Sequence, residues 1–451
     1  MPIEFPASFW EHCWTHRRNL QGDLRCAILA AGLGRRLEPL TARLLPKPLF
    51  PLGGKLPLAE IWVRRLVQSG ITDVSMNLCV LAETIARHFG DGSKFCADIK
   101  YVFEKTPTGT LGGVCKQALG RTAKILGDEP PLTAEPFAGS TLIAPSGDIV
   151  TNFDAGHLEQ TYEIHKRTGA AFTIVLVPVP WERRRDFGTV LLDDVQPGAG
   201  EISRYGRVRD FREKDPNSPS NLNNASIYLI EMDLIRELDA LRTEAKLGLD
   251  NPFYDFGKHV FPAMLGQIPY AKLSRDYPLV GVQYDGAWFD VGQKRDYLRV
   301  NQHLLDGDLK ANIPYDQMPW GYLGTDVAID FSSVKIIPPV VIGNHCTIEP
   351  GATVGPYAVI GDGWVLQRGS TVRNSVLWEI YPSYDEAGRE LSVAQRRLLD
   401  RHEIREGVTI DGCIVSGGAL TTDFTDQTVE VLDDGRLRAL SIDYVPDAPR
   451  V

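Results

Sequence analysis

The strongest constraint on the fold of this 451-residue chain is a six-residue repeat near its C-terminus. An aliphatic residue returns at every sixth position, often close to glycine or another small residue; the six positions are Ile342, Ile348, Val354, Ile360, Leu366 and Val372. This period is typical of a parallel left-handed β-helix, in which each coil buries its aliphatic positions against the next coil. The repeat therefore predicts a small β-helix domain over residues 331–451.

The repeat is interrupted before the chain ends. Residues 379–406 contain a helix-like segment, LSVAQRRLLDRHEI, which predicts a helical insertion, and Ile410–Val415 then returns to a short strand. The recognisable hexapeptides amount to about two coils. We expect residues 309–330, in front of them, to be a linker.

Residues 23–308 alternate short apolar runs with amphipathic stretches. The runs predicted as strands include Cys26–Ala31, Val74–Leu78, Thr141–Ala144, Phe172–Val177, Ser226–Ile230 and Val280–Tyr284. The helical stretches include Leu58–Ser69 and Ala82–Phe89. Strands separated by helices predict an α/β fold with a Rossmann-like, mostly parallel sheet. Residues 1–22 are an aromatic-rich extension, predicted as a short helix, with Phe5, Phe9, Trp10 and Trp14.

Charge and composition exclude several classes of protein. A formal net charge of -10 argues against a nucleic-acid-binding protein, which would carry a basic face. The N-terminus lacks the apolar core of a signal peptide, and nowhere do 18 apolar residues run together, so we expect a cytoplasmic protein without membrane spans. An anionic substrate would have to be held by a few well-placed cations.

The segment Leu29–Gly54, LAAGLGRRLEPLTARLLPKPLFPLGG, contains the most informative motif. Its glycines follow a predicted strand, where they let the backbone approach a ligand and turn N–H groups toward phosphate oxygens. A dinucleotide fingerprint would need glycine at Leu37, and a P-loop would need GK[ST], so both are excluded. Lys47 lies between two prolines, which favour one extended backbone geometry.

Two aspartates follow apolar runs. Asp148 lies in the motif Ser-Gly-Asp after the run at Thr141–Ala144, and Asp290 lies in the motif GAWFDVG. Binding sites of parallel sheets lie at such strand ends. Because Mg²⁺ is commonly held by one or two carboxylates plus substrate phosphates, two aspartates and a nucleotide suffice for a metal site. Taken alone, an aspartate in such a context is more often a turn residue than a metal ligand.

Together these motifs resemble the sugar nucleotidyltransferase family, whose signature is GxGTRLxPLTxxxPKPL, and are similar to mannose-1-phosphate guanylyltransferases. The resemblance covers residues 25–308, and many relatives share the hexapeptide tail. It implies that Asp148 and Asp290 bind Mg²⁺ and that Arg36 and Lys47 contact the triphosphate. It also implies a nucleotide cradle formed by Leu29, Ala31, Gly32 and Gly34. Arg35 stands where the family commonly has threonine, and is an additional candidate contact.

The resemblance extends to the sugar side. The segments FREK, ending at Lys214, and NASIY, beginning at Asn224, look like the family's FxEKP and NxGIY motifs. By this resemblance Lys214 would bind the sugar phosphate, while Glu213 and Asn224 would hydrogen-bond sugar hydroxyls. Two positions differ, since Asp215 replaces a proline and Ser226 replaces a glycine. A solvated charge run is the alternative interpretation of the Glu-Lys pair.

The segment EKTPTGTLGG, residues 104–113, resembles the family's nucleobase loop, and implies that Glu104, Gly109 and Thr110 contact the nucleotide. A carboxylate only accepts hydrogen bonds, and guanine presents two adjacent donors. Glu104 therefore predicts a preference for GTP, with UTP next.

The sequence thus predicts a Mg²⁺-dependent enzyme that transfers a nucleoside monophosphate from GTP or another triphosphate to a sugar 1-phosphate. Three alternatives stay open: a uridylyltransferase or other member of the family, a bifunctional enzyme with an acyltransferase in the β-helix, and a catalytically silent NDP-sugar sensor. Every candidate site residue precedes residue 300. We therefore expect the tail to mediate homo-oligomer assembly and its removal to affect chemistry little.

Overall fold

The computed structural model describes residues 23–120, 123–126, 129–133, 137, 139–244, 255–268, 273–379, 402–432 and 436–445. The predicted N-terminal extension and most of the predicted insertion lie outside these residues. The described chain forms two compact units. We call residues 23–33 and 59–288 the sheet unit, and residues 34–58 and 289–445 the β-helix unit.

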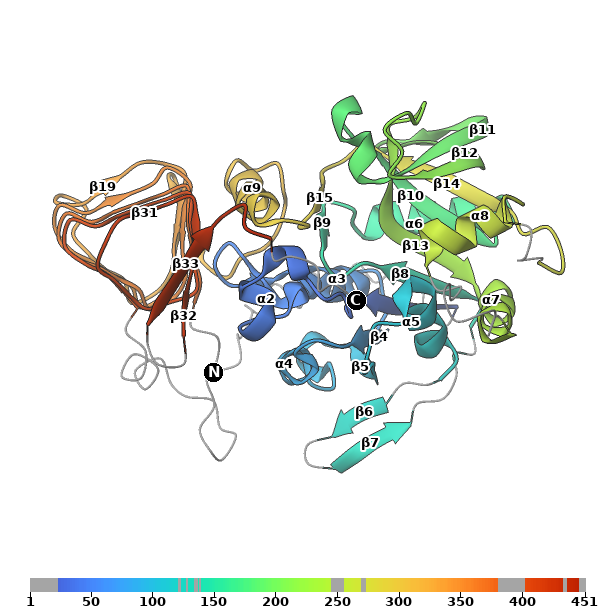
Figure 1. Ribbon diagram of the computed structural model, residues 1–451, viewed down its shortest axis with the longest axis horizontal. Helices are drawn as coiled ribbons and strands as arrows, with labels where there is room; N and C mark the ends of the chain where they lie inside the picture. The colour runs from blue at the N-terminus through green and yellow to red at the C-terminus, as the bar shows by residue number, and fades with distance from the viewer. Residues whose placement is uncertain are drawn as a thin grey trace. The chain divides into compact units, whose positions relative to one another are not determined.

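The sheet unit is built on a mixed sheet whose parallel part follows the order β8-β1-β4-β5 (Figure 1). These strands are β1 Leu24–Leu29, β4 Asp73–Leu78, β5 Asp98–Phe103 and β8 Thr141–Pro145. Nearly every residue of β1 and β8 is buried, as expected for strands covered on both faces. The α/β fold with parallel central strands predicted from the sequence is confirmed.

The flanks of this sheet are largely antiparallel, which the sequence pattern did not indicate. The flanking strands are β6 Ala123–Leu126, β7 Glu129–Thr133, β10 Phe172–Pro178, β11 Gly188–Ala199, β12 Ile202–Glu213, β13 Leu222–Glu231 and β14 Leu279–Tyr284. The two long strands β11 and β12 pair with each other, and β13 joins them to β8. Two further short strands are β9 Ile149–Thr151 and β15 Trp288–Asp290.

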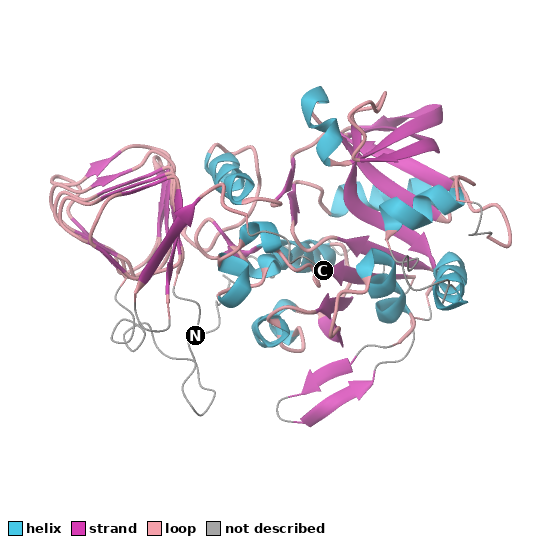
Figure 2. Cartoon of the chain, viewed as in Figure 1, coloured by secondary structure: helices cyan, strands magenta, loops and turns pink. Residues whose placement is uncertain are grey.

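Helices cover the sheet of this unit (Figure 2). They are α3 Leu58–Gln68, α4 Ala82–Phe89, α5 Gly109–Ala118, α6 Ala155–Arg167, α7 Met232–Glu244 and α8 Phe261–Met264, with short turns η3 Ser93–Phe95, η4 Trp181–Asp186 and η5 Phe256–Val260. Helix α5 packs against β1, β4 and β5 and against α7. No helix among the described residues is long and apolar enough to cross a membrane.

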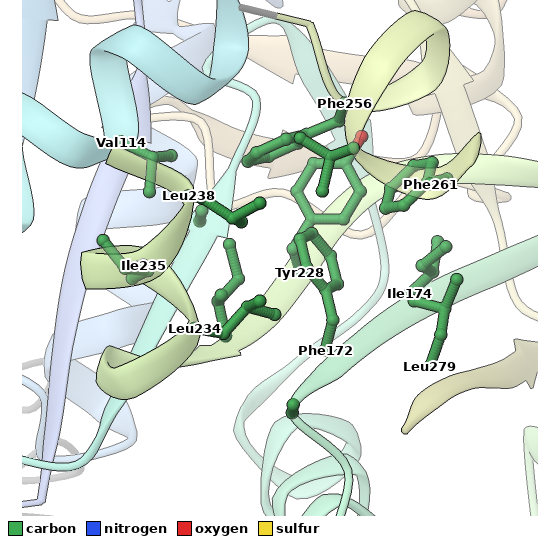
Figure 3. Close-up of a cluster of buried hydrophobic side chains, with 14 of the residues drawn as sticks. Val114, Phe172, Ile174, Tyr228, Leu234, Ile235, Leu238, Phe256, Phe261 and Leu279 are labelled. Carbon is green, nitrogen blue, oxygen red and sulfur yellow. The ribbon is translucent and has the colours of Figure 1, made fainter. Parts of the chain in front are cut away.

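An aromatic cluster fills the core between α7, α8 and the sheet. Phe172, Tyr228 and Phe256 meet edge to face with ring centroids 5.1–5.6 Å apart, and α7 adds Leu234 and Leu238 (Figure 3). Such edge-to-face pairs contribute about 0.5–1.5 kcal/mol each beyond the apolar area they bury. This packing fixes β13, which carries Asn224 of the predicted sugar side, and η5, whose Gly257 lies against Glu213.

The β-helix unit is a three-sided parallel solenoid (Figures 1 and 2). Strand pairing repeats after 18 residues, since Val340 pairs with Ala358, Thr347 with Val365 and Thr353 with Thr371. The six repeat positions predicted from the sequence are at most 3% exposed. The predicted β-helix is confirmed.

The first side of the solenoid comprises β16 Asp316–Met318, β17 Gly321–Leu323, β20 Val340–Ile342, β23 Ala358–Ile360, β26 Val376–Leu377, β29 Ile414–Val415, β32 Gln427–Val431 and β33 Leu437–Ser441. The second comprises β18 Ala328–Ile329, β21 Thr347–Ile348, β24 Val365–Leu366, β27 Glu403–Ile404 and β30 Ala419–Leu420. The third comprises β19 Lys335–Ile336, β22 Thr353–Val354, β25 Thr371–Arg373, β28 Thr409–Asp411 and β31 Phe424–Thr425.

Two expectations for the tail need correction. The solenoid is longer than the expected two coils, because five parallel strands stack on each of two sides. Its strands also begin within the range 309–330 that was expected to be a linker, because β17 and β18 pair with β20 and β21 although they lack the hexapeptide signature. The remaining predicted domain boundaries stay a prediction.

The β-helix unit also contains the segment after the glycine-rich turn. It forms η1 Arg35–Leu37, α2 Leu40–Arg43, η2 Lys47–Leu49, β2 Pro51–Leu52 and β3 Leu56–Pro57. Helix α9, Lys294–Leu305, precedes the first strand of the solenoid. This unit therefore joins residues that are far apart in the sequence.

Candidate active site

The glycine-rich turn leaves β1 at the carboxyl edge of the parallel strands. The carbonyl of Leu29 accepts a hydrogen bond from the N–H of Gly147 (2.9 Å), and the N–H of Ala30 donates to the side chain of Asn77 (2.8 Å). A Cβ placed on Gly32 would meet no atom within 4 Å. The turn is therefore fixed by neighbouring strands, while the backbone at Gly32 faces open space that a ligand can enter. Ala31 beside it is buried.

Gly34 begins the next part of the motif, in the β-helix unit. Its backbone is left-handed (φ 63°), and a Cβ would lie 2.8 Å from Thr41 Cγ2. We expect Gly34→Ala to raise the KM for the nucleotide about tenfold, since small displacements of a binding loop have effects of this size. The matched control is Gly169→Ala, because Gly169 has a similar φ of 62° and a Cβ there would meet no atom within 4 Å. Steady-state kinetics would contradict the expectation if both variants behaved alike.

The predicted triphosphate contacts come together in the β-helix unit. Lys47 is only 9% exposed, and its Nζ lies 3.5 Å from Asp290 Oδ1. A Cβ on Gly292 would lie 3.1 Å from Asp290 Oδ2 and 3.2 Å from Arg36 Nη2, so the guanidinium lies beside the same glycine. The structure thus brings Arg36 and Lys47 beside Asp290, which lies up to 254 positions away in the sequence. Arg35, on η1, is exposed.

The second predicted metal ligand belongs to the sheet unit. Asp148 follows β8 and is partly exposed, and its Oδ1 accepts a hydrogen bond from the Ser146 hydroxyl (2.5 Å). The loop is anchored further along, where the Thr151 hydroxyl and the Asn152 N–H both donate to the carbonyl of Ala287 (2.7 and 2.9 Å). A carboxylate held at a parallel strand end with partial exposure is suited to bind a cation.

The predicted base-reading residue, Glu104, makes hydrogen bonds within the protein. The side chain of Glu104 is fully buried, and its Oε2 accepts hydrogen bonds from the Thr108 N–H (2.7 Å) and the Thr108 hydroxyl (2.9 Å). Its Oε1 accepts from Asn77 Nδ2 (3.3 Å) and lies 3.9 Å from Lys116 Nζ. The carboxylate therefore stabilises the turn of residues 104–108, and its contact with the base stays a prediction.

The rest of this loop leads into α5. Gly109 has a left-handed backbone (φ 72°) and is the first residue of that helix. The hydroxyl of Thr110 accepts a hydrogen bond from the N–H of Phe256 (2.9 Å), so this side chain joins α5 to η5. Their predicted contacts with the nucleotide stay predictions.

On the predicted sugar side, Glu213 lies at the end of β12 against two glycines. A Cβ on Gly188 or Gly257 would come within 2.7 or 2.8 Å of its Oε2. The resulting desolvation raises the pKa of the Glu213 carboxyl, while the charge of Lys214 opposes the rise and that of Asp255 adds to it. Lys214 itself is exposed, with a left-handed backbone (φ 52°).

Asn224 organises the neighbouring strand. Its Oδ1 accepts from the N–H of Ser226 (3.0 Å), and its Nδ2 donates to the hydroxyl of Tyr228 (2.9 Å). Ser226, which stands where the family has glycine, has a left-handed backbone (φ 59°), and its carbonyl accepts from the N–H of Ser146 (2.9 Å). The Asn224 side chain thus stabilises an irregularity in strand β13, next to the loop of Asp148.

One residue at the site was missed from the sequence. Asn77 is 3% exposed, and it bonds both the Ala30 N–H and the Glu104 carboxylate, so it connects the two predicted nucleotide loops. The available signal was an amide near the end of the predicted strand Val74–Leu78, where sites of parallel sheets lie. Among the described residues, no three histidine, cysteine, aspartate or glutamate side chains form a cluster that could hold a metal.

These features define a glycine-rich turn, a lysine–aspartate pair and an acidic strand-end loop on an α/β sheet followed by a β-helix. A model of the nucleotidyl transferase family matches residues 26–307, and the chain belongs to this family. The enzyme class and the extent of the resemblance predicted from the sequence are confirmed.

Individual relatives differ in the nucleotide that their names specify. The chain is 28% identical to a UTP--glucose-1-phosphate uridylyltransferase of Synechocystis sp., over 89% of this chain and 94% of the relative. It is 28% identical to a mannose-1-phosphate guanylyltransferase of Mycobacterium tuberculosis, over 76% and 82%. It is 25% identical to a glucose-1-phosphate adenylyltransferase of Anaeromyxobacter sp., over 86% and 92%.

Proposed function

We propose that the protein joins a nucleoside triphosphate to a sugar 1-phosphate and releases pyrophosphate. The observation that carries this proposal is the cluster of Arg36, Lys47 and Asp290, in which two cations able to offset phosphate charge lie beside a carboxylate able to hold a metal. The relatives named above act on sugar 1-phosphates with three different nucleotides, which supports the class of reaction.

In the proposed reaction an oxygen of the sugar 1-phosphate attacks the α-phosphorus. The bond from that phosphorus to the oxygen bridging to the β-phosphate breaks, and pyrophosphate leaves. Such a displacement depends mainly on positioning and charge stabilisation. Arg36 and Lys47 offset the charge of the leaving pyrophosphate, and Lys214 offsets that of the incoming phosphate. No general base is needed, because the sugar phosphate is already ionised at neutral pH.

The sugar hydroxyls are assigned to Glu213 and Asn224. Their carboxylate and amide offer acceptors and donors that match a diol. Glu213 is exposed at the end of β12, so a sugar hydroxyl can reach its carboxylate. The nearby Asn224 keeps one amide hydrogen beyond the one donated to Tyr228, and this hydrogen is assigned to the sugar.

The donor groups fit a divalent cation. Asp148 and Asp290 are hard oxygen ligands, and two carboxylates with substrate phosphates are a common Mg²⁺ site. We propose that both aspartates bind Mg²⁺, which would neutralise phosphate charge and polarise the α-phosphate when bound. While the metal and the substrate are absent, the positive charge of Lys47 compensates the negative charge of the nearby Asp290 carboxylate.

The proposed nucleotide is UTP, ahead of GTP. The preference for GTP required the Glu104 carboxylate to accept hydrogen bonds from guanine, whereas this carboxylate accepts them from Thr108 and Asn77. The uridylyltransferase of Synechocystis sp. aligns over nearly the whole of both chains, which supports UTP. The base is then read by backbone groups of the loop that Glu104 stabilises.

The test is a pyrophosphate-release assay over UTP, GTP, ATP and dTTP, each with several sugar 1-phosphates. UTP is expected to give the highest kcat/KM, and Glu104→Gln is expected to lower activity with all four nucleotides without changing their order. A change of order in Glu104→Gln would show that the side chain reads the base. Nucleotide binding without turnover would favour the sensor, and acetyl transfer would favour the bifunctional alternative.

The remaining predictions concern the whole protein. We propose that it is a cytoplasmic homo-oligomer assembled through the β-helix. Support comes from the exposed ring of Phe331, which lies 6.0 Å from that of Trp320 in the first coils of the solenoid. Light scattering on the full chain measures the oligomeric state directly.

A further inference from the structure

The segment that carries Lys47 continues into a buried aromatic contact with the β-helix. Phe50 is fully buried, and its ring centroid lies 4.8 Å from that of Trp378 and 5.4 Å from that of Tyr297. Trp378 directly follows strand β26 of the solenoid, and Tyr297 lies on α9. The Phe50 N–H donates to the Lys47 carbonyl (3.1 Å), so the aromatic contact and the lysine belong to one turn.

Hydrogen bonds fix the same segment from helix α9. The hydroxyl of Tyr297 donates to the Pro51 carbonyl (2.5 Å) and accepts from Trp378 Nε1 (3.0 Å). The side-chain oxygen of Asn301, one helical turn later, accepts from the N–H of Gly53 (2.9 Å). All these groups are buried, and a buried polar group that loses its partner is strongly disfavoured. The backbone after Lys47 therefore has few alternative positions.

A buried ion-pair network adds a third attachment. The ammonium of Lys55 forms ion pairs with Asp362 and Glu379, two residues of the solenoid, and its side chain is 15% exposed. Asp362 also accepts hydrogen bonds from the Tyr315 hydroxyl (2.8 Å) and from the N–H of Asn344 (2.8 Å). Buried charges persist only when they are paired and hydrogen-bonded, so these partners specify one arrangement.

The positions of both Lys47 and Asp290 thus depend on helix α9. Helix α9, which binds Pro51 and Gly53 through its side chains, begins four residues after Asp290. The expectation that the tail could be removed with little effect on chemistry assumed an independent solenoid. This assumption is wrong, because the solenoid and residues 34–58 belong to one compact unit.

We propose that the β-helix is a scaffold of the nucleotide site and that the Tyr297 hydroxyl, bridging Trp378 and Pro51, is a positioning group for Lys47. This inference rests on the proposed function. Lys47 offsets charge on the triphosphate only if its ammonium is held at the right place, and a displacement of about 1 Å can cost as much as a hundredfold in rate. The scaffold therefore affects nucleotide handling more than sugar-phosphate handling.

The test is Tyr297→Phe in the full-length protein, which deletes one oxygen and keeps the ring. We expect kcat/KM for the nucleotide to fall about tenfold, with the KM for the sugar phosphate changed less than about twofold. The matched control is Tyr357→Phe, because the Tyr357 hydroxyl also bonds a residue beside α9, Asp306 (2.9 Å), without touching the Lys47 segment. That variant should keep wild-type kinetics.

A second variant, Glu379→Gln, removes one negative charge from the solenoid side of the ion-pair network. It should show the same selective loss of nucleotide kcat/KM, and it provides the test if Tyr297→Phe does not fold. Melting curves and calorimetric titration of UTP on folded protein separate positioning from unfolding. Wild-type nucleotide kinetics in a folded Tyr297→Phe or Glu379→Gln variant, or equal losses for both substrates, would overturn the inference. Absence of turnover in the wild-type protein would instead overturn the proposed function.

Discussion

Asp290→Asn is expected to lower kcat by about a hundredfold or more while the protein stays folded. Asparagine has nearly the same volume as aspartate but no charge, so it would bind a divalent cation weakly and remove the negative charge that lies 3.5 Å from Lys47 Nζ. Asp148→Asn should have an effect of similar size, because its carboxylate is the other proposed ligand. Steady-state kinetics at increasing Mg²⁺ concentration, with circular dichroism as a check on folding, measure the effect.

The matched control is Asp285→Asn. Asp285 is exposed, lies five positions before Asp290, and contacts Gln283 rather than the proposed site. Its substitution should leave kcat unchanged. Full activity of both Asp148→Asn and Asp290→Asn at saturating Mg²⁺ would refute the metal assignment, and insolubility of either variant would show that the carboxylate has a structural role.

Lys47→Met and Lys214→Ala are expected to impair the use of different substrates. Methionine preserves the packing of the buried Lys47 stem but removes the charge, so binding and turnover of the nucleotide should weaken. Lys214 is exposed, and its loss should raise the KM for the sugar phosphate. A charge-assisted contact contributes about 1.5–3 kcal/mol, which corresponds to a change of roughly ten- to a hundredfold.

The two lysine variants serve as controls for each other when both substrates are varied independently. Lys47→Met should leave the sugar-phosphate KM nearly unchanged, and Lys214→Ala should leave the nucleotide KM nearly unchanged. An unaltered sugar-phosphate KM in Lys214→Ala would mean that the sugar phosphate is bound elsewhere. The same KM change in both variants would mean that the two lysines do not belong to separate subsites.

The parts of the fold with a local signal were predictable from the sequence. The aliphatic residue at every sixth position identified the β-helix because each coil must bury that position, and the buried strands β1 and β8 appeared as continuous apolar runs. The first coils were missed because β17 and β18 pair through backbone hydrogen bonds without the hexapeptide pattern. The long hairpin of β11 and β12 was missed because the second half of β11 is exposed and contains no continuous apolar run.

The site was predictable in its residue types more than in its contacts. Lys47 and Asp290 were identified separately by their motifs, whereas their ion pair depends on segments 243 positions apart. The Glu104 carboxylate accepts hydrogen bonds from Thr108 and Asn77. The sequence alone cannot distinguish a carboxylate that accepts hydrogen bonds from the protein from one that accepts them from a nucleobase. The contact of Phe50 with Trp378 likewise could not be predicted, because it produces no periodic pattern in the sequence.

The fate of isotopic label tests the proposed chemistry most directly. The protein is incubated with Mg²⁺, glucose 1-phosphate or mannose 1-phosphate, and a nucleoside triphosphate labelled with phosphorus-32 at either the α or the γ position. Attack at the α-phosphorus predicts that α label appears in an NDP-sugar and that γ label appears in pyrophosphate. Transfer of γ label to the sugar phosphate, or NDP-sugar formation without the α label, would contradict nucleotidyl transfer.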